Sequence, residues 1–349
     1  MDGPKHSGVR PCLSEPSVYT VIRDGISMNT LQDEIDSLRM KCIGCGKCSL
    51  VCPSLKHGGC DPKEIMIGND RDILQCIACG NCSRVCRRTD PFTVMRDLIS
   101  IAKGLRVSQA FKDTGYAQPM DDVPSRELKP EWTGDDAYIM PGCMVKCKVP
   151  YVEYAASKAM KAIGVGCREL EGNTCCMHPP QFREMTEFER RRYKSSMGAA
   201  AKGKSLIALC CGCSDDLNES GVDAVHIIPY LAERLDSLPK FSDSVKVAIE
   251  PGCSAMRFGK EMRAIVESMG CKVVNSKMGC CGKYSPQSEK LMEEREAECA
   301  GAEFIVVGCP MCLIRYEDCP EGLPTVHIAE LVAMSAGDWT TLEYHKIKP

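Results

Sequence analysis

Short apolar runs alternate with longer amphipathic stretches through the second two-thirds of the chain. The apolar runs occupy residues 137–140, 205–209, 223–228, 246–250, 271–274, 304–307 and 324–328. The stretches with helical character lie among them, at residues 152–164, 187–204, 261–270 and 288–301. Strands that alternate with helices are typical of α/β units with a largely parallel sheet.

The order of these segments occurs twice, and the flanking sequences repeat with it. YIMPGC is matched by AIEPGC, AIGVGCRELEGNTCC by SMGCKVVNSKMGCC, and LIALCCGC by FIVVGCPMC. The period is about 110 residues, which is too long for a solenoid repeat. We therefore predict two duplicated α/β modules, the first at 136–239 and the second at 240–349.

The N-terminal third has a different pattern. Leu31, Ile35 and Leu38 lie on one face of a predicted helix, and residues 91–105 form a second amphipathic stretch. Residues 106–135 contain three prolines and predict an extended linker. The predicted organisation is an N-terminal extension (1–40), a ferredoxin-like domain (41–105), the linker, and the two modules. For the ferredoxin-like domain we predict the α+β, ferredoxin-type class, built from helices and loops.

Charge and cysteine content narrow the classes of function. Lys and Arg number 44 against 47 Asp and Glu, so the net charge of −3 suggests neither nucleic acid nor an anionic membrane surface. No apolar run approaches the ~20 residues that cross a bilayer. The 26 cysteines fall in C-x-x-C sets within a long chain, unlike a secreted disulfide scaffold. We predict a cytoplasmic protein without direct membrane insertion.

Two runs with the spacing C-x-x-C-x-x-C-x-x-x-C predict two cubane [4Fe-4S] clusters. Three closely spaced thiolates hold three irons, and the other run supplies the fourth ligand. One cluster is expected on Cys42, Cys45, Cys48 and Cys86, and the other on Cys76, Cys79, Cys82 and Cys52. Zinc sites seldom need eight thiolates. Cys60, between the runs, is expected to be a buried thiol.

Each module carries a lone cysteine, a vicinal pair and a C-x-x-C. Adjacent cysteines suit two metal atoms of one cluster better than a zinc ribbon, and they fall where strands end, the edge at which open α/β sheets gather ligands. Cys147 and Cys211 are additional thiols, and they are the first alternatives for any of these ligand positions. The expected ligands are Cys143, Cys175, Cys176, Cys210 and Cys213 in the first module, and Cys253, Cys280, Cys281, Cys309 and Cys312 in the second.

These motifs, including LEGNTCC, CCGC, PGC, MGCCG and GCPMC, resemble heterodisulfide reductase. The modules resemble its CCG-domain subunit and the eight-cysteine region resembles its electron-feeding subunit. The chain therefore resembles a natural fusion of the two, as in the membrane-linked form of that enzyme. The resemblance implies two noncubane [4Fe-4S] clusters, with Met177 replacing the CCG glycine in the first module. It also implies that the disulfide of coenzymes M and B is cleaved between them.

The resemblance further implies catalytic roles for Cys175, Cys176, Cys280, Cys281 and His178, and an electron-donating flavin protein or ferredoxin within a larger hetero-oligomer. An anionic disulfide needs cations near the cysteine loops, for which the candidates are His178, Arg183, Arg257, Lys283 and Arg315. Two alternatives stay open. One is an electron-transfer component of thiol:fumarate reductase or of lactate, glycolate or glycerol-3-phosphate oxidation. The other is a non-catalytic, cluster-handling component of a methanogen redox complex.

Overall fold

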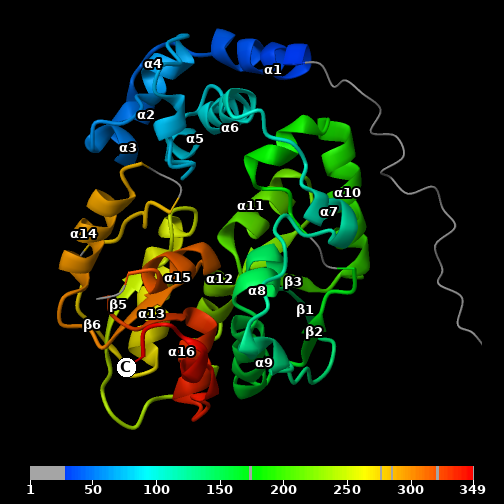
Figure 1. Ribbon diagram of the computed structural model, residues 1–349. Helices are drawn as coiled ribbons and strands as arrows, with labels where there is room; N and C mark the ends of the chain where they lie inside the picture. Colours follow the sequence, from blue (N-terminus) through cyan, green and yellow to red (C-terminus); the bar gives the residue numbers. More distant parts are fainter. Residues whose placement is uncertain (1–27, 173–174, 276, 284–285, 320–321, 349) are drawn as a thin grey trace, which may run out of the picture.

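The computed structural model describes residues 28–172, 175–275, 277–283, 286–319 and 322–348. Of the predicted extension, residues 1–27 lie outside this part of the chain. Helices alone form the first region, and two α/β modules follow (Figure 1). The N-terminal region, blue and cyan, lies across the first module (green) and the second (yellow to red).

Helices and loops make up all of the described residues between 28 and 105. Helices α1 and α6 pack together because their apolar faces meet, with Ile35 fully buried against Val94 and Met95. Short helices connected by turns lie between them. The helices are α1 (Met28–Met40), α2 (Lys47–Leu50), α3 (Pro53–Lys56), α4 (Pro62–Met66), η2 (Ile73–Gln75), α5 (Asn81–Val85) and α6 (Pro91–Ala102).

The segment at 106–135 runs along the first module and contains α7 (Gln109–Thr114) and η3 (Pro124–Glu127). Phe111 is buried and meets Phe182 edge to face, with ring centroids 4.8 Å apart. The backbone N–H of Val107 donates to Glu184 Oε2 at 2.8 Å. These contacts hold the segment against the loop that follows the first vicinal cysteine pair.

Two four-stranded sheets have the same order, and all of their described pairings are parallel. The first has the order β2-β1-β3-β4 and the second β6-β5-β7-β8. This arrangement confirms two α/β modules with parallel sheets. The strands are β1 (Ala137–Met140), β2 (Cys167–Glu169), β3 (Ser205–Ala208), β4 (Ala224–His226), β5 (Lys246–Glu250), β6 (Lys272–Val273), β7 (Phe304–Val307) and β8 (Thr325–His327).

Helices of the two modules pack against each other, α16 against α9 and α12 against α13. One hydrophobic core therefore contains residues of both modules. Helices of the first module are α8 (Gly142–Lys148), α9 (Tyr151–Ala162), η4 (Pro180–Glu184), α10 (Glu187–Ala200), α11 (Cys211–Glu219), α12 (Ile227–Ala232) and η5 (Leu235–Ser237). Those of the second are η6 (Met256–Phe258), α13 (Gly259–Ser268), α14 (Ser288–Cys299), α15 (Pro310–Glu317), α16 (Ile328–Ser335) and η7 (Thr340–Tyr344). Within the described residues, no helix combines the length and apolar character needed to cross a membrane.

Candidate metal centres

Four cysteines from the two N-terminal runs line one cavity, which we call the outer cavity. Cys42, Cys45 and Cys48 come from the first run, and Cys86 comes from the end of the second. This is the set expected from the spacing, with the fourth thiol supplied by the other run. The structure brings these side chains together, and their role as ligands stays a prediction.

A second cavity, the inner cavity, is lined by the complementary set of Cys52, Cys76, Cys79 and Cys82. Cys60 also lines it and is only 1% exposed. The Cys60 thiol makes side-chain hydrogen bonds with Cys52 and Cys76. The thiol that was expected to be merely buried is therefore a fifth sulfur on the wall of this cavity.

Four cysteines share one local geometry, in which the backbone N–H two residues later donates to the sulfur. The donors are Gly44 to Cys42, Ala78 to Cys76, Met177 to Cys175 and Gly282 to Cys280, at 3.3 to 3.4 Å. All four donors have positive φ, including Met177 at 65° and Gly282 at 68°. The loop in the first module thus keeps the conformation of its counterpart even though methionine replaces glycine. A left-handed residue with a side chain costs about 1–2 kcal/mol, which the surrounding loop has to offset.

The first-module cysteines meet at the carboxyl ends of its strands. Cys143 follows β1, and Cys210 follows β3 and caps α11. Side-chain hydrogen bonds connect their thiols in series. Cys143 bonds with Cys175, Cys175 with Cys176, Cys176 with Cys213, and Cys213 with Cys210. All five predicted ligands of this module therefore form one connected group.

The second module repeats this order. Cys253 bonds with Cys280, Cys280 with Cys281, Cys281 with Cys312, and Cys312 with Cys309. Cys309 then contacts the thiols of Cys210 and Cys211 in the first module. The ten predicted ligands form a continuous chain of sulfur contacts across the module interface, which we call the thiol array.

Hydrogen bonds within the thiol array favour the thiolate at equivalent positions. Bonds from Cys175 and Cys213 hold the pKa of Cys176 well below its usual range, and bonds from Cys280 and Cys312 do the same for Cys281. A hydrogen bond with Cys211 also lowers the pKa of Cys210, and one with Cys280 lowers the pKa of Cys253. These four thiols of the array are therefore the ones most readily ionised. Metal binding requires the thiolate form.

The inner cavity adjoins the thiol array. Cys79 packs in one buried group with Ile77, Cys280 and Leu291, and Cys253 lies against this group. Polar contacts join the same two regions, including Lys56 Nζ to Glu294 at 2.8 Å and Gln287 Nε2 to Gln75 Oε1 at 2.7 Å. The inner cavity thus meets the second module directly.

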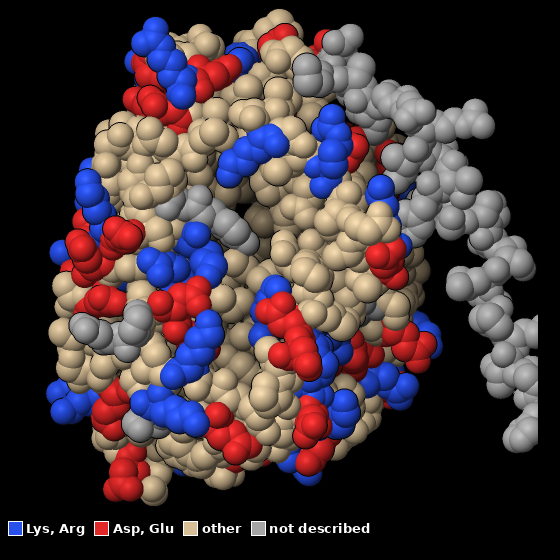
Figure 2. Space-filling view, in the orientation of Figure 1, with Lys and Arg blue, Asp and Glu red and all other residues tan. Residues whose placement is uncertain are grey.

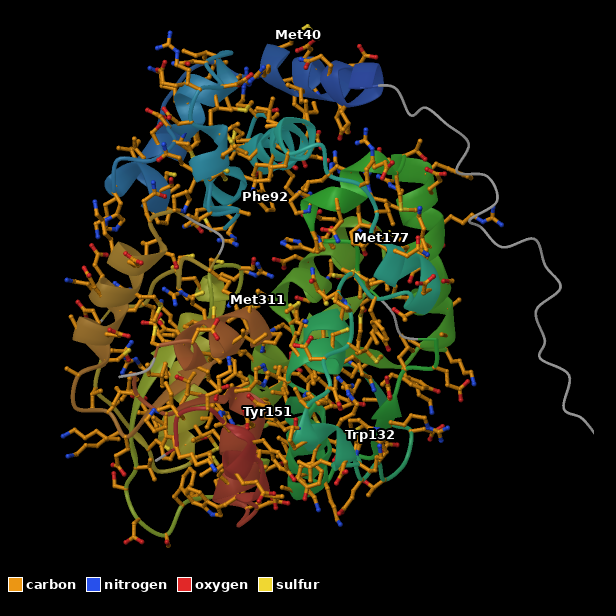
Figure 3. The ribbon with its side chains drawn as sticks, viewed as in Figure 1. Met40, Phe92, Trp132, Tyr151, Met177 and Met311 are labelled. Atoms are coloured by element: carbon orange, nitrogen blue, oxygen red, sulfur yellow. The ribbon has the colours of Figure 1, made fainter. Side chains whose placement is uncertain are left out.

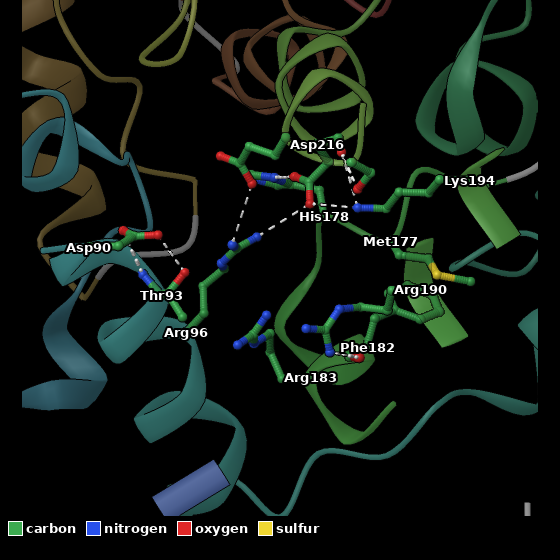
Figure 4. A network of polar contacts seen from close by, with 12 residues as sticks. Asp90, Thr93, Arg96, Met177, His178, Phe182, Arg183, Arg190, Lys194 and Asp216 are labelled. Atoms are coloured by element: carbon green, nitrogen blue, oxygen red, sulfur yellow. Dashed lines mark hydrogen bonds and ion pairs between the residues drawn. The ribbon is translucent and has the colours of Figure 1, made fainter. Parts of the chain in front are cut away.

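His178 belongs to a buried polar network between the N-terminal region and the first module (Figure 4). Its Nδ1 hydrogen-bonds with Asp216, which also receives Lys194 Nζ at 3.2 Å and Arg96 Nη1 at 3.5 Å. Burial disfavours the charged ring, but the Asp216 carboxylate outweighs it and raises the pKa of His178 to about 9. The ring is therefore a cation at neutral pH, close to Cys176.

The other cations expected near a substrate have different surroundings. Arg183 is 6% exposed and pairs with Asp97 and with Glu34 at 2.8 Å, so it joins the N-terminal region to the first module. Among the candidate cations for a substrate, Arg183 is therefore ruled out, because both carboxylates neutralise it. Arg257 pairs with Asp215, and Lys283 with Asp318 at 2.6 Å. Arg315 donates to Ser288 Oγ at 3.0 Å and lies near Cys281.

Two histidines that the sequence did not single out brace the module interface reciprocally. His226 Nδ1 accepts the N–H of Ile228, so Nε2 carries the proton and donates to Gly308 O at 2.9 Å in the second module. His327 accepts from Ala329 and donates to Leu209 O at 3.1 Å in the first. Each accepting carbonyl directly precedes a cysteine of the thiol array. The repeated sequence Val-His-Ile was the signal for this pair.

The donor sets fit iron–sulfur clusters. Each cavity of the N-terminal region is lined by cysteines from both runs, and the thiol array consists of sulfur donors alone. No three or more His, Cys, Asp or Glu side chains among the described residues converge closely enough for a single metal ion. Sulfur donors spaced around a cavity are the arrangement that Fe–S clusters use.

Family models match two parts of the chain. Residues 35–87 match a 4Fe-4S dicluster domain, and residues 247–315 match the cysteine-rich domain called CCG. The first match contains all of the cysteines that line the two cavities, and the second contains the five thiol-array cysteines of the second module.

Curated relatives are archaeal and share low identity. One subunit of a ferredoxin/F420H2-dependent CoB-CoM heterodisulfide reductase from Methanosarcina acetivorans is 22% identical over 265 residues, covering 56% of this chain and 87% of that protein. One subunit of the fumarate reductase (CoM/CoB) from Methanothermobacter marburgensis is 23% identical over 323 residues. That alignment covers 85% of this chain, which spans 61% of the length of the relative.

A solved structure supports the fold. A hypothetical protein from Helicobacter pylori superimposes with a TM-score of 0.54 over 95% of this chain and 77% of its own length. The two sequences are 11% identical, so this likeness concerns the fold alone.

Proposed function

The chain carries a 4Fe-4S dicluster domain and a CCG cysteine-rich domain and is similar to subunits of archaeal redox enzymes, and we propose that it is the catalytic subunit of a heterodisulfide reductase. In this role it takes electrons at the N-terminal region and reduces the disulfide of coenzymes M and B at the modules. The reaction breaks the S–S bond, and each sulfur gains one electron and one proton.

The continuous thiol array is the observation that carries this proposal. Its two halves meet at Cys309 and Cys210, beneath one interface that two reciprocal histidine bonds hold in place. Cleavage of a disulfide yields two chemically equivalent sulfur atoms, and a site built from two equivalent modules offers one set of thiols for each. When bound, clusters of the predicted types supply one-electron transfer and, in the noncubane form, iron that takes up thiolate.

Nearby side chains provide a proton and positive charge. His178 is held through Nδ1 by Asp216, so Nε2 is the atom from which a proton would pass to a leaving thiolate. Arg315 lies on the side of the second module, near Cys281, and would balance an anionic group of the coenzymes. Figure 2 shows a hollow beneath the N-terminal region with basic side chains on its borders, which would give a substrate access.

A relay without catalysis is the second candidate. The observation behind it is the alignment with a subunit of a fumarate reductase (CoM/CoB), which covers most of this chain. As a relay, the chain would pass its electrons on to a partner protein. The contact of Cys79 with Cys253 and Cys280 serves either role. In both cases the electron donor is a separate protein, either a flavin protein or a ferredoxin.

Reduction of the coenzyme M–coenzyme B disulfide tests the proposal. Anaerobic holo-protein with reduced methyl viologen is expected to cleave this disulfide at a rate proportional to protein concentration, with two viologen radicals oxidised for each disulfide. Simple disulfides such as cystamine, which lack the anionic groups, are expected to react more slowly. Rapid electron exchange with a flavoprotein and no cleavage of any disulfide would favour the relay.

A further inference from the structure

Basic side chains surround the outer cavity at the surface of the N-terminal region. Lys47, Lys63, Arg87 and Arg88 line the same cavity as its four cysteines. Lys63 pairs with Glu64 at 3.4 Å, whereas Lys47, Arg87 and Arg88 form no ion pair with another residue in the described part of the chain. Three unneutralised cations therefore lie at the mouth of the outer cavity.

The same mouth exposes sulfur and large apolar side chains. Cys45 is the one exposed cysteine among those described. Ile43, two residues before it, is 63% exposed, and Met40 is 81% exposed. Apolar side chains this open, next to cations, are typical of the centre and rim of a protein interface.

The outer cavity and the inner cavity have different neighbours. Cys79 of the inner cavity packs against the second module, whereas the outer cavity opens to solvent through Cys45. In Figure 3, Met40 lies at the outer end of the N-terminal region, and Phe92 lies on its side toward the modules. An electron that enters beside Met40 thus has the inner cavity between it and the thiol array.

We propose that Met40, Ile43, Lys47, Lys63, Arg87 and Arg88, which we call the basic face, bind a small electron-carrying protein with an acidic rim. The inference rests on the proposed function and adds the chemistry of its electron donor. Apolar contacts with Met40 and Ile43 would place the donor's redox centre over Cys45. The cations would orient it, because complementary charge raises association rates about 10- to 1,000-fold.

Charge reversal on the basic face tests this proposal by stopped-flow reduction of the full-length holo-protein. The double variant Lys47→Glu/Arg88→Glu is expected to lower the second-order rate constant with a reduced, acidic 2[4Fe-4S] ferredoxin at least about tenfold at low ionic strength. The wild-type rate is expected to fall as salt is added, because screening weakens steering. The variant is expected to lose most of this dependence.

Two controls isolate docking from other effects. Lys240→Glu/Lys260→Glu makes the same change in net charge at exposed positions of the second half of the chain, and less than a twofold change in rate is expected. Reduced methyl viologen is a cation and is expected to reduce every variant at least as fast as wild type. Ile43→Ala leaves the local charge and hence the potential unchanged, and it is expected to slow reduction by ferredoxin alone.

Wild-type rates and salt dependence in Lys47→Glu/Arg88→Glu would overturn the proposal, as would equal slowing by the Lys240/Lys260 variant. Failure of the proposed function gives a different result. In that case no disulfide is cleaved by viologen-reduced protein, while the dependence of ferredoxin reduction on the basic face persists.

Discussion

Cys280→Ala is expected to reduce disulfide cleavage to the background rate while the N-terminal centres stay reducible. Cys280 is 5% exposed, hydrogen-bonds with Cys253 and Cys281, and packs with Cys79 of the inner cavity. Its loss would break the thiol array where electrons are expected to enter it. Viologen-coupled disulfide reduction measures the rate of cleavage. Electron paramagnetic resonance of the dithionite-reduced protein shows whether the N-terminal centres are still reduced.

Cys271→Ala is the matched control for this variant. Cys271 is buried at 6% exposure in the same module, directly before β6, and lies outside the thiol array. A small loss of stability with normal activity is expected. Wild-type activity in Cys280→Ala would contradict the role of the array, and loss of the N-terminal signals would show that the change acts through general unfolding.

Arg183→Met is expected to lower the free energy of unfolding by about 3–5 kcal/mol, because it leaves a buried carboxylate without its partner. The side chain of Asp97 is completely buried, and Arg183 binds it through two nitrogens while also reaching Glu34. These contacts join α6 and α1 to the first module. Anaerobic thermal unfolding and limited proteolysis between residues 103 and 108 measure the effect.

Arg191→Met is the control, since Arg191 and its partner Glu187 are both more than 60% exposed. Exposed pairs contribute about 0–1 kcal/mol, so little change is expected. Adding Asp97→Leu to Arg183→Met is expected to restore most of the lost stability, because removing both buried charges avoids the desolvation penalty. Equal stabilities of Arg183→Met and Arg191→Met would contradict the account of this interface.

The hydrophobic pattern predicted the modules well, since every apolar run contains a strand of the structure. Strand β2 was missed because its residues, Cys167 to Glu169, include two charged side chains and one apolar residue. It pairs with β1 at the edge of its sheet, where backbone hydrogen bonds rather than burial define the strand. The internal repeat was the available signal, since GVGCRE aligns with SMGCKV, which leads into β6.

Cysteine spacing predicted which side chains lie together, because closely spaced cysteines in a short run can be arranged around one cavity in only a few ways. It predicted the exchange of Cys52 and Cys86 between the two cavities for the same reason. Sequence alone could not show which residues lie opposite one another across an interface. Arg183 was therefore counted among the candidate cations for a substrate, although Asp97 neutralises it. The partners of His226 and His327 in the opposite module were not foreseen.

The number of irons per chain tests the central claim most directly, namely that one polypeptide holds two N-terminal clusters and two more on the thiol array. Anaerobically purified or reconstituted protein is expected to contain about sixteen irons and sixteen sulfides, or four clusters of four. Cys280→Ala is expected to lower this to about twelve irons while Cys271→Ala leaves it unchanged. A content near eight irons, with no difference between the two variants, would contradict the account.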